Sequence, residues 1–212
     1  MARDDDQVKA LLAAYEEEAE ATGWFGPEVV FGLAYAYVQS SDLMLDIGIG
    51  TGLGSDLFRK AGLEVHGMDN SQQMLEASLS KGINSLKLHD LRISPYPYEP
   101  ASFDHAVCTG VMNFYRELSV VFKETARLLK AGGLFAFVVG DRTENEPAAI
   151  VVGPEHTHTD EPVTMYRHSQ EEIGRWLKNH NFSLIRSLPF TMFLDRKQVR
   201  KVGAKAYVAR KL

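Results

Sequence analysis

The sequence predicts an α/β protein with a doubly wound, seven-stranded and mostly parallel sheet and helices on both faces. Over about the first 140 residues, short apolar runs alternate with segments of helical periodicity, which is typical of strands joined by crossover helices. A glycine-rich stretch at residues 46–52 separates the first run from the next helix. Two later apolar runs, at residues 182–188 and 204–209, predict a hairpin-like pair that supplies an antiparallel C-terminal strand.

Two amphipathic helices are expected before the sheet. The first follows the acids at positions 4–6, carries apolar residues at helical spacing and ends at Gly23. The second opens at Gly26-Pro27, since proline suits a first helical turn, and keeps one apolar face as far as Val38. Residues 1–40 are therefore expected to form an N-terminal helical cap.

Five apolar runs predict the parallel strands of a core at residues 43–140. A strand that is covered on both faces has a nearly continuous apolar sequence. The runs lie at residues 43–47, 63–68, just before Asp90, 103–108 and 134–139. Helices are expected between them, with caps and stops at Gly62, Asn70 or Ser71, Gly82 and Gly132-Gly133.

The tail of the chain has a different character. Residues 141–164 are polar and irregular, and we expect residues 141–168 to be an insert near an acceptor pocket. Ser169 and Glu172 form a capping box that opens a closing helix, and this helix and the strands after it make up residues 169–212. With 212 residues, 45% of them hydrophobic, residues 1–212 suit one domain with a full core.

The composition of the chain argues against several classes of protein. A net charge of −5 argues against general nucleic-acid binding. The single cysteine, Cys108, allows neither an internal disulfide nor a cysteine-based metal site. No apolar run reaches the roughly 18 residues of a membrane-spanning helix, and the first residues do not resemble a signal peptide. We therefore expect a cytoplasmic protein without membrane association. Two histidines within residues 155–161 suggest zinc, but nothing fixes their geometry, and no metal is expected.

The glycine stretch and three acids suggest a nucleoside-binding site. Asp69 lies at the end of the second run, where a carboxylate can accept both ribose hydroxyls. Asp90 follows the third run, where it could accept a hydrogen bond from an adenine amino group. The spacing is G-x-G-x-G rather than the dinucleotide G-x-G-x-x-G, and Asp46 before the first glycine would repel a pyrophosphate but suit an ammonium group.

Four segments together resemble the motifs of class I methyltransferases that use S-adenosylmethionine (SAM). Residues 45–52 (LDIGIGTG) resemble motif I, and residues 66–75 resemble the second motif, G-x-D-x-S-x-x-M-L. Residues 102–108 are similar to the fourth-strand motif, and residues 128–134 to the L-L-K-P-G-G turn. More weakly, residues 166–169 and 207–210 resemble predicted methyltransferases related to the TPR-fused and Williams–Beuren-region enzymes.

This resemblance implies a role for each matching residue. The glycine turn would line the methionine part of SAM, Asp69 would hold the ribose, and the residues after the second and third strands would contact adenine. Residues at the end of the fourth strand would lie near the sulfonium, and a tyrosine of the first helix would close over the methionine carboxylate. The implied cofactor contacts are Tyr15, Asp46, Gly48, Ile49, Gly50, Asp69, Asn70, Met74, Asp90, Leu91, Cys108 and Thr109. Ordinary packing remains an alternative for Tyr15, Met74 and Cys108, and we expect His105 to be a satisfied position within the sheet.

The expected activity is methyl transfer to a small-molecule O or N acceptor, leaving S-adenosylhomocysteine. The acceptor pocket is expected around Trp24, Phe25, residues 112–115 and residues 165–168, with His168 and Tyr166 as candidate catalytic bases. A catalytically silent SAM sensor or scaffold and a nucleotide-linked oxidoreductase remain alternatives. The chain is expected to act as a monomer or homodimer.

Overall fold

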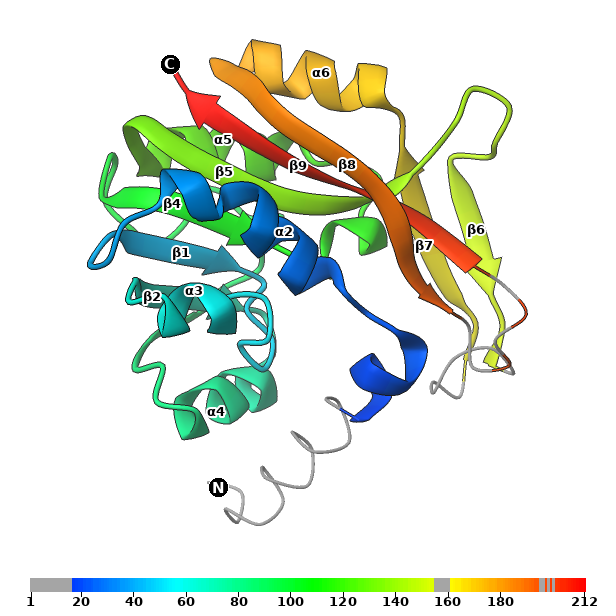
Figure 1. The fold of residues 1–212 in the computed structure, drawn as a ribbon, viewed down its shortest axis with the longest axis horizontal. Coiled ribbons are helices and arrows are strands. Elements are labelled where there is room, and N and C mark those ends of the chain that lie inside the picture. Colours follow the sequence, from blue (N-terminus) through cyan, green and yellow to red (C-terminus); the bar gives the residue numbers. More distant parts are fainter. Residues whose placement is uncertain (1–16, 155–160, 195–196, 198, 200) are drawn as a thin grey trace.

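The fold is known from a computed structural model that describes residues 17–154, 161–194, 197, 199 and 201–212 (Figure 1). The expected first helix lies mostly outside the described residues, and so does Tyr15. Only its last turn, residues 17–22, is described, and it ends at Gly23 as predicted.

A seven-strand path forms the centre of the molecule. Its order is β3 (Ser85–Leu88), β2 (Glu64–Asp69), β1 (Leu43–Ile47), β4 (Phe103–Cys108), β5 (Leu129–Asp141), β9 (Lys201–Lys211) and β8 (Phe182–Leu194). The first five strands are mutually parallel, whereas β9 runs antiparallel to both β5 and β8. The predicted mostly parallel sheet with an antiparallel C-terminal strand is therefore confirmed.

Two additional strands correct the expectation that residues 141–164 are irregular. β7 (Val163–His168) pairs in parallel with the last residues of β5, Gly140 and Asp141, and β6 (Ala149–Val152) pairs antiparallel with β7. The sheet thus has nine strands among the residues that the structure describes. β6 has only four residues between polar and proline-containing segments, so its periodicity is too short to indicate a strand, and its pairing with β7 decides its structure.

Alternating residues of β5 show why the central strands are apolar throughout. Phe135, Phe137 and Val139 belong to one apolar cluster, which includes residues of α5 (Ser119–Leu128) and α6 (Gln170–Asn179). Leu134, Ala136 and Val138 belong to a second cluster on the other face, with α2 (Gly26–Ala34) and Phe58 of α3 (Asp56–Lys60). Helices therefore cover both faces (Figure 1).

The helix boundaries follow their capping chemistry. Ser71 caps α4 (Gln72–Ser80) by accepting a hydrogen bond from the Met74 amide, and the predicted capping box of α6 is present, because Ser169 and Glu172 bond reciprocally. A single 3₁₀ turn, η1 (Tyr35–Tyr37), extends α2. By contrast, α5 ends at Leu128, and the glycines expected to close it lie inside β5.

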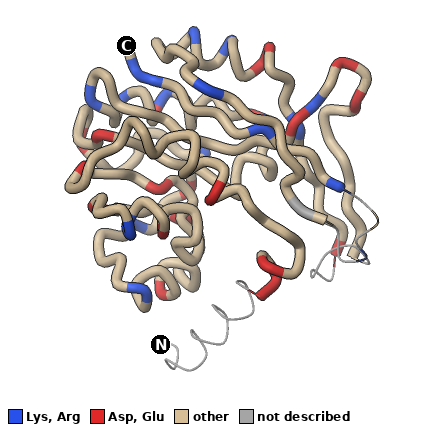
Figure 2. The backbone as a smooth tube through the Cα atoms, viewed as in Figure 1, with Lys and Arg blue, Asp and Glu red and all other residues tan. Residues whose placement is uncertain are grey.

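Surface charges of both signs are interspersed over the described chain, as Figure 2 shows for the backbone positions of Lys, Arg, Asp and Glu. Within the described residues, no helix combines the length and the apolar character needed to cross a membrane. His105 is a satisfied sheet position, as expected: its Nε2 lies 2.9 Å from Asp42 Oδ2, and the Leu134 amide donates to its Nδ1.

Candidate functional site

The glycine turn folds back over the end of the neighbouring strand. Gly48 and Gly50 have φ angles of +72° and +54°, which favour glycine. The amides of Gly48 and Ile49 both donate to the Met68 carbonyl, at 2.8 and 3.0 Å. A Cβ atom at Gly48 would lie 2.6 Å from Val111 Cγ2, so the turn also needs the missing side chain at this position.

The Asp69 carboxylate joins the glycine turn to the end of β2. Its Oδ2 accepts a 2.9 Å hydrogen bond from the Gly50 amide, and its Oδ1 accepts one of 2.9 Å from the Ser71 amide. Each oxygen keeps a second lone pair for a ligand. The carboxylate is therefore held in place before any ligand binds.

A pocket open to solvent lies at the carboxyl ends of these strands. It is lined by Gly48, Met68, Asp69, Asn70, His89, Leu91, Val111 and Tyr115. Of these, Gly48, Asp69, Asn70 and Leu91 were predicted as cofactor contacts from the sequence, and Tyr115 was assigned to the acceptor pocket.

Three lining residues were not expected from the sequence: Met68, His89 and Val111. His89 directly follows β3, and Val111 comes three residues after β4 ends. Ligands of open α/β sheets bind beyond the carboxyl ends of the strands, so chain position alone was a signal for His89 and Val111. Met68 carries no such signal, because it resembles any apolar strand residue.

Asp46 is buried at the end of β1 and is only 1% exposed. Burial raises its pKa to about 7, the nearby Ser55 hydroxyl offsets part of that rise, and the charge of Asp69 adds to it. Among the described residues, Asp46 Oδ2 has no hydrogen-bond partner, and neither do the buried hydroxyls of Thr51 and Ser55. This end of the site therefore contains buried oxygen atoms that lack a hydrogen-bond partner in the described part of the chain and could bond a ligand.

Asp90 lies beside the pocket rather than in its lining. Its carboxylate forms an ion pair with Arg92, with Nη2 2.5 Å from Oδ2 and Nε 3.0 Å from both oxygens. These hydrogen bonds lower the pKa of Asp90. The adenine contact expected of Asp90 stays a prediction, and it would require the carboxylate to be shared with Arg92.

Four further described residues that were expected to contact the cofactor, Ile49, Met74, Cys108 and Thr109, do not line this pocket. Ile49 packs in an apolar cluster with Val65 and Leu75 of the sheet and α4. Cys108 is fully buried, and burial raises the pKa of its thiol well above the usual value. Met74 is half-buried on α4. The Thr109 hydroxyl faces Gly54, where an added Cβ would lie 2.3 Å from it. The expected contacts of these residues stay predictions.

His168 connects β7 to the loop after β4. Its Nε2 lies 3.1 Å from the Tyr115 carbonyl oxygen, and its ring packs edge-on against Trp176 at 5.4 Å. A carbonyl only accepts, so Nε2 carries a proton. Burial lowers the pKa of His168, which keeps the ring neutral. This arrangement suits a residue that holds Tyr115 in place better than one that removes a proton at Nε2.

The residues expected around the acceptor differ in how far they are exposed to solvent. Trp24 lies against the turn after β4, since a Cβ at Gly110 would be 3.5 Å from its ring, and Met112 and Asn113 are buried. Phe25 and Phe114 are 58% and 48% exposed. Tyr166 is half-buried in β7, opposite Ala149 of β6. The histidines considered for zinc, at positions 156 and 158, lie outside the described residues.

Comparison with known proteins agrees with this geometry. Residues 45–137 match the family described as "Methyltransferase domain". A ubiquinone biosynthesis O-methyltransferase of Xanthomonas oryzae pv. oryzae is 26% identical over 149 residues, which cover 66% of this chain and 62% of that protein. The enzyme of the same name from Proteus mirabilis is 28% identical over 71% of this chain and 56% of its own length. The chain thus spans less than two thirds of the length of these relatives.

Solved structures show the same fold. A SAM-dependent methyltransferase from Methanosarcina mazei superposes with a TM-score of 0.71 at 20% identity, covering 85% of this chain and 97% of that one. The 1,6-didemethyltoxoflavin-N1-methyltransferase of Burkholderia thailandensis, with bound S-adenosylhomocysteine, superposes with a TM-score of 0.66 at 15% identity, covering 100% and 91%. The chain therefore has the fold of these SAM-dependent methyltransferases, and its residues 45–137 match the methyltransferase-domain family.

Proposed function

We propose that the chain is a SAM-dependent methyltransferase that acts on a small molecule through an oxygen or nitrogen atom. The observation that carries this proposal is the Asp69 carboxylate, which faces the pocket while two backbone amides hold it. A fixed carboxylate beside a glycine turn suits the two hydroxyls of a ribose.

The residues present fit the rest of SAM. Met68, Asn70, His89 and Leu91 form a mixed apolar and polar lining that suits an adenine ring. Among the described residues, none accepts a hydrogen bond from the Leu91 amide, which leaves this donor available to an adenine nitrogen. At the glycine turn, Asp46 Oδ2 has no hydrogen-bond partner among the described residues and suits the positively charged end of the cofactor.

Charge also separates this proposal from a nucleotide-linked oxidoreductase. Asp46 and Asp69 lie close enough for the charge of Asp69 to raise the pKa of Asp46. Asp46 at the glycine turn would repel the pyrophosphate of a dinucleotide, whereas it favours a ligand that carries an ammonium group. Asp69 does not separate the two, since a dinucleotide site uses the same ribose acid.

When bound, SAM supplies a methyl group on an activated sulfonium, and the protein's residues supply alignment and a dry site. Gly48 and Asp69 would hold the nucleoside at the sheet edge, and Tyr115 would close the pocket on the side of the fourth strand. His168 would hold Tyr115 through its carbonyl oxygen. Tyr166 and the Nδ1 atom of His168 stay candidates for a base, which is needed only when the acceptor must lose a proton.

An oxygen acceptor of modest size is the specific form of this proposal. The relatives named ubiquinone biosynthesis O-methyltransferases support oxygen as the target atom. Trp24, Phe25 and Phe114 supply aromatic surface that suits a partly apolar molecule.

Calorimetry with SAM and S-adenosylhomocysteine, followed by transfer of a labelled methyl group to a panel of phenols, catechols and amines, tests the proposal. Binding of both compounds with turnover on a hydroxylated acceptor is the expected result. Binding without turnover on any acceptor would favour a SAM sensor or scaffold. Binding of NAD or NADP but not of SAM would overturn the proposal.

A further inference from the structure

We propose that Tyr96 is a positioning residue for the adenine end of the pocket, held by Glu124 and Arg127 of α5. This inference rests on the proposed function, because it assigns the Leu91 backbone to adenine. Tyr96 itself does not line the pocket. It acts through the segment between β3 and β4, residues 89–102, which contributes His89 and Leu91 to the lining.

This segment has no regular strand or helix and contains three prolines, at positions 95, 97 and 100. Prolines donate no backbone hydrogen bond, and a loop without ladder pairing leaves carbonyl groups that need donors. The Arg127 guanidinium supplies them, because Nη2 donates to the Tyr96 carbonyl at 2.9 Å and Nη1 donates to the Tyr98 carbonyl at 3.0 Å.

Glu124 holds the same loop by accepting hydrogen bonds from two of the loop's donor groups. Its Oε2 accepts from the Tyr96 amide at 2.9 Å, and its Oε1 accepts from the Ser94 hydroxyl at 2.7 Å. Glu124 is 1% exposed and lies 2.7 Å from Arg127 Nη2. Burial alone would raise the pKa of Glu124, but the hydrogen bonds from Arg127, Ser94 and the Tyr96 amide lower it, so the carboxylate stays ionised.

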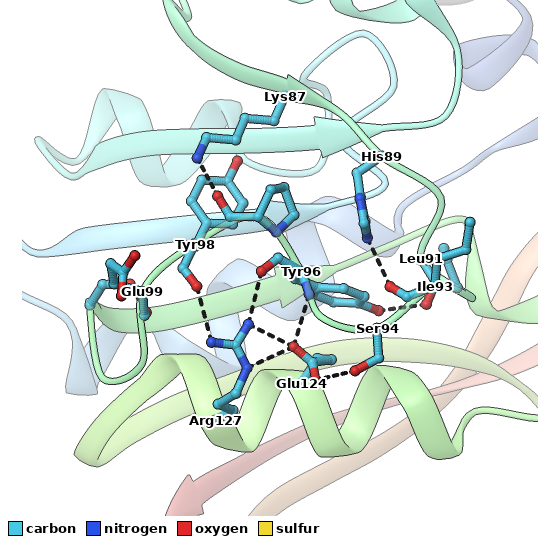
Figure 3. Close-up of polar contacts among 12 residues, drawn as sticks. Lys87, His89, Leu91, Ile93, Ser94, Tyr96, Tyr98, Glu99, Glu124 and Arg127 are labelled. Atoms are coloured by element: carbon cyan, nitrogen blue, oxygen red, sulfur yellow. Dashed lines mark hydrogen bonds and ion pairs between the residues drawn. The ribbon is translucent and has the colours of Figure 1, made fainter.

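The side chain of Tyr96 connects the part of the loop bound to α5 with Leu91, which lines the pocket. Its ring is buried, and its hydroxyl donates to the Leu91 carbonyl at 2.8 Å (Figure 3). Residues of α5 thus hold the backbone of Tyr96, and the hydroxyl of the same residue holds the carbonyl group of Leu91. Burial raises the pKa of Tyr96 far above its usual value, so the hydroxyl remains a donor. His89 joins the same unit, since its Nε2 lies 2.8 Å from the Ile93 carbonyl oxygen and its ring packs edge-on against Tyr96.

A buried ion pair contributes little net stability, because the desolvation of both charges offsets their attraction. Its effect here is geometric, since two hydrogen bonds accepted by Glu124 and two donated by Arg127 fix the backbone and the Ser94 side chain of one loop. The expected consequence is recognition of the adenine edge by the Leu91 amide, rather than a gain in overall stability.

Tyr96→Phe and Tyr98→Phe form a matched pair for the test. Each variant loses one tyrosine hydroxyl from the same loop, but the Tyr98 hydroxyl bonds the Gly67 carbonyl of β2 at 2.9 Å and not Leu91. Calorimetry would give the dissociation constants of S-adenosylhomocysteine and S-inosylhomocysteine for each protein. The inosine compound carries a hydrogen at N1, where adenine offers a lone pair to the Leu91 amide.

The wild-type chain should prefer the adenosine compound, and Tyr96→Phe should reduce this preference about tenfold, the worth of one hydrogen bond. Tyr98→Phe should leave the preference within about twofold. In ligand-free protein, amide hydrogen exchange of residues 89–93 should accelerate in Tyr96→Phe and not in Tyr98→Phe. A general loss of stability would weaken both compounds equally and would not change the ratio.

Glu124→Gln provides a second variant, which keeps an acceptor for the Tyr96 amide but removes the charge opposite Arg127. The preference of this variant for the adenosine compound over the inosine compound should also fall, as in Tyr96→Phe. An unchanged ratio in Tyr96→Phe, or an equal fall in both tyrosine variants, would overturn the positioning role while SAM binding stood. Failure of the wild-type chain to bind S-adenosylhomocysteine would instead overturn the proposed function, and unchanged exchange at residues 89–93 would still refute the role of Tyr96 in the loop.

Discussion

The Gly50 amide donates a 2.9 Å hydrogen bond to the Asp69 carboxylate, and this contact joins the tips of two neighbouring strands into one binding edge. The contact uses one lone pair of Oδ2 and orients the carboxylate toward the pocket. Asp69 therefore has two tasks, since it shapes the glycine turn and, in the proposed function, binds the ribose.

Asp69→Asn should weaken binding of S-adenosylhomocysteine by roughly 1.5–3 kcal/mol, the worth of hydrogen bonds to a charged acceptor. The amide keeps the shape of the side chain but replaces one acceptor oxygen with a donor. Calorimetry measures the change. Asp56→Asn is the control, because Asp56 pairs with Arg59 and Lys60 on α3 and does not line the pocket. Equal affinity in the wild type and Asp69→Asn would remove the ribose role.

Gly48→Ala should lower both stability and cofactor affinity. A side chain at φ +72° costs about 1–2 kcal/mol, and the new Cβ would lie 2.6 Å from Val111 Cγ2. Urea unfolding and calorimetry would measure the two effects. The double variant Gly48→Ala/Val111→Ala should recover part of the loss, because it removes the contacted methyl groups. If the double variant behaved like the single one, the contact with Val111 would not be the cause.

Gly174→Ala should raise the unfolding free energy by about 0.5–1 kcal/mol. Gly174 is an exposed residue within α6, and an added Cβ would meet nothing within 4 Å. Alanine loses less backbone entropy in a helix than glycine does. The midpoint of urea unfolding measures the gain, and cofactor affinity should be unchanged. A lower midpoint would show that this part of α6 depends on glycine.

The contribution of Asp46 to the free energy of unfolding should fall as pH rises from about 4 to about 7, opposite in sign to the contribution of His168, whose pKa burial lowers. Burial raises the pKa of Asp46 to about 7 from 3.8, so in this range the folded chain keeps a proton that the unfolded chain has lost. Asp46→Asn should remove this contribution, roughly 2–3 kcal/mol between pH 5 and pH 8. Urea unfolding at both values measures it. Asp56→Asn should follow the wild-type trend, and a parallel trend in Asp46→Asn would show that Asp46 ionises normally.

His168→Gln should keep methyl transfer within about tenfold of the wild type, whereas His168→Ala should lose more. The glutamine amide can still donate to the Tyr115 carbonyl, and the alanine cannot. A residue that acts as a general base contributes about 10²–10⁴-fold, so a loss of that size in both variants would restore His168 as a base. Turnover numbers with a single acceptor, measured across pH, distinguish the two roles.

The order of the elements and part of the site could be predicted because local chemistry decides them. The apolar run of β1, the Ser71 cap of α4 and the capping box of Ser169 each depend on residues that are neighbours in the chain. The resemblance of residues 45–52 and 66–75 to methyltransferase motifs agrees with the matched family and the shared fold. Gly48, Asp69, Asn70 and Leu91, which this resemblance implies as cofactor contacts, line one pocket, and their contacts with a cofactor stay predictions.

Only the tertiary structure decided the features that depend on contacts between distant parts of the chain. The four residues of β6 become a strand because β7 supplies hydrogen-bond partners. His168 contacts the Tyr115 carbonyl, 53 positions away in the chain, and the sequence gives no sign of this contact. Glu124 and Arg127 lie on a helix whose sequence gives no sign that it anchors the loop of Tyr96. Periodicity and capping report on neighbours within about four residues, whereas hydrogen bonds across the fold depend on how whole elements pack.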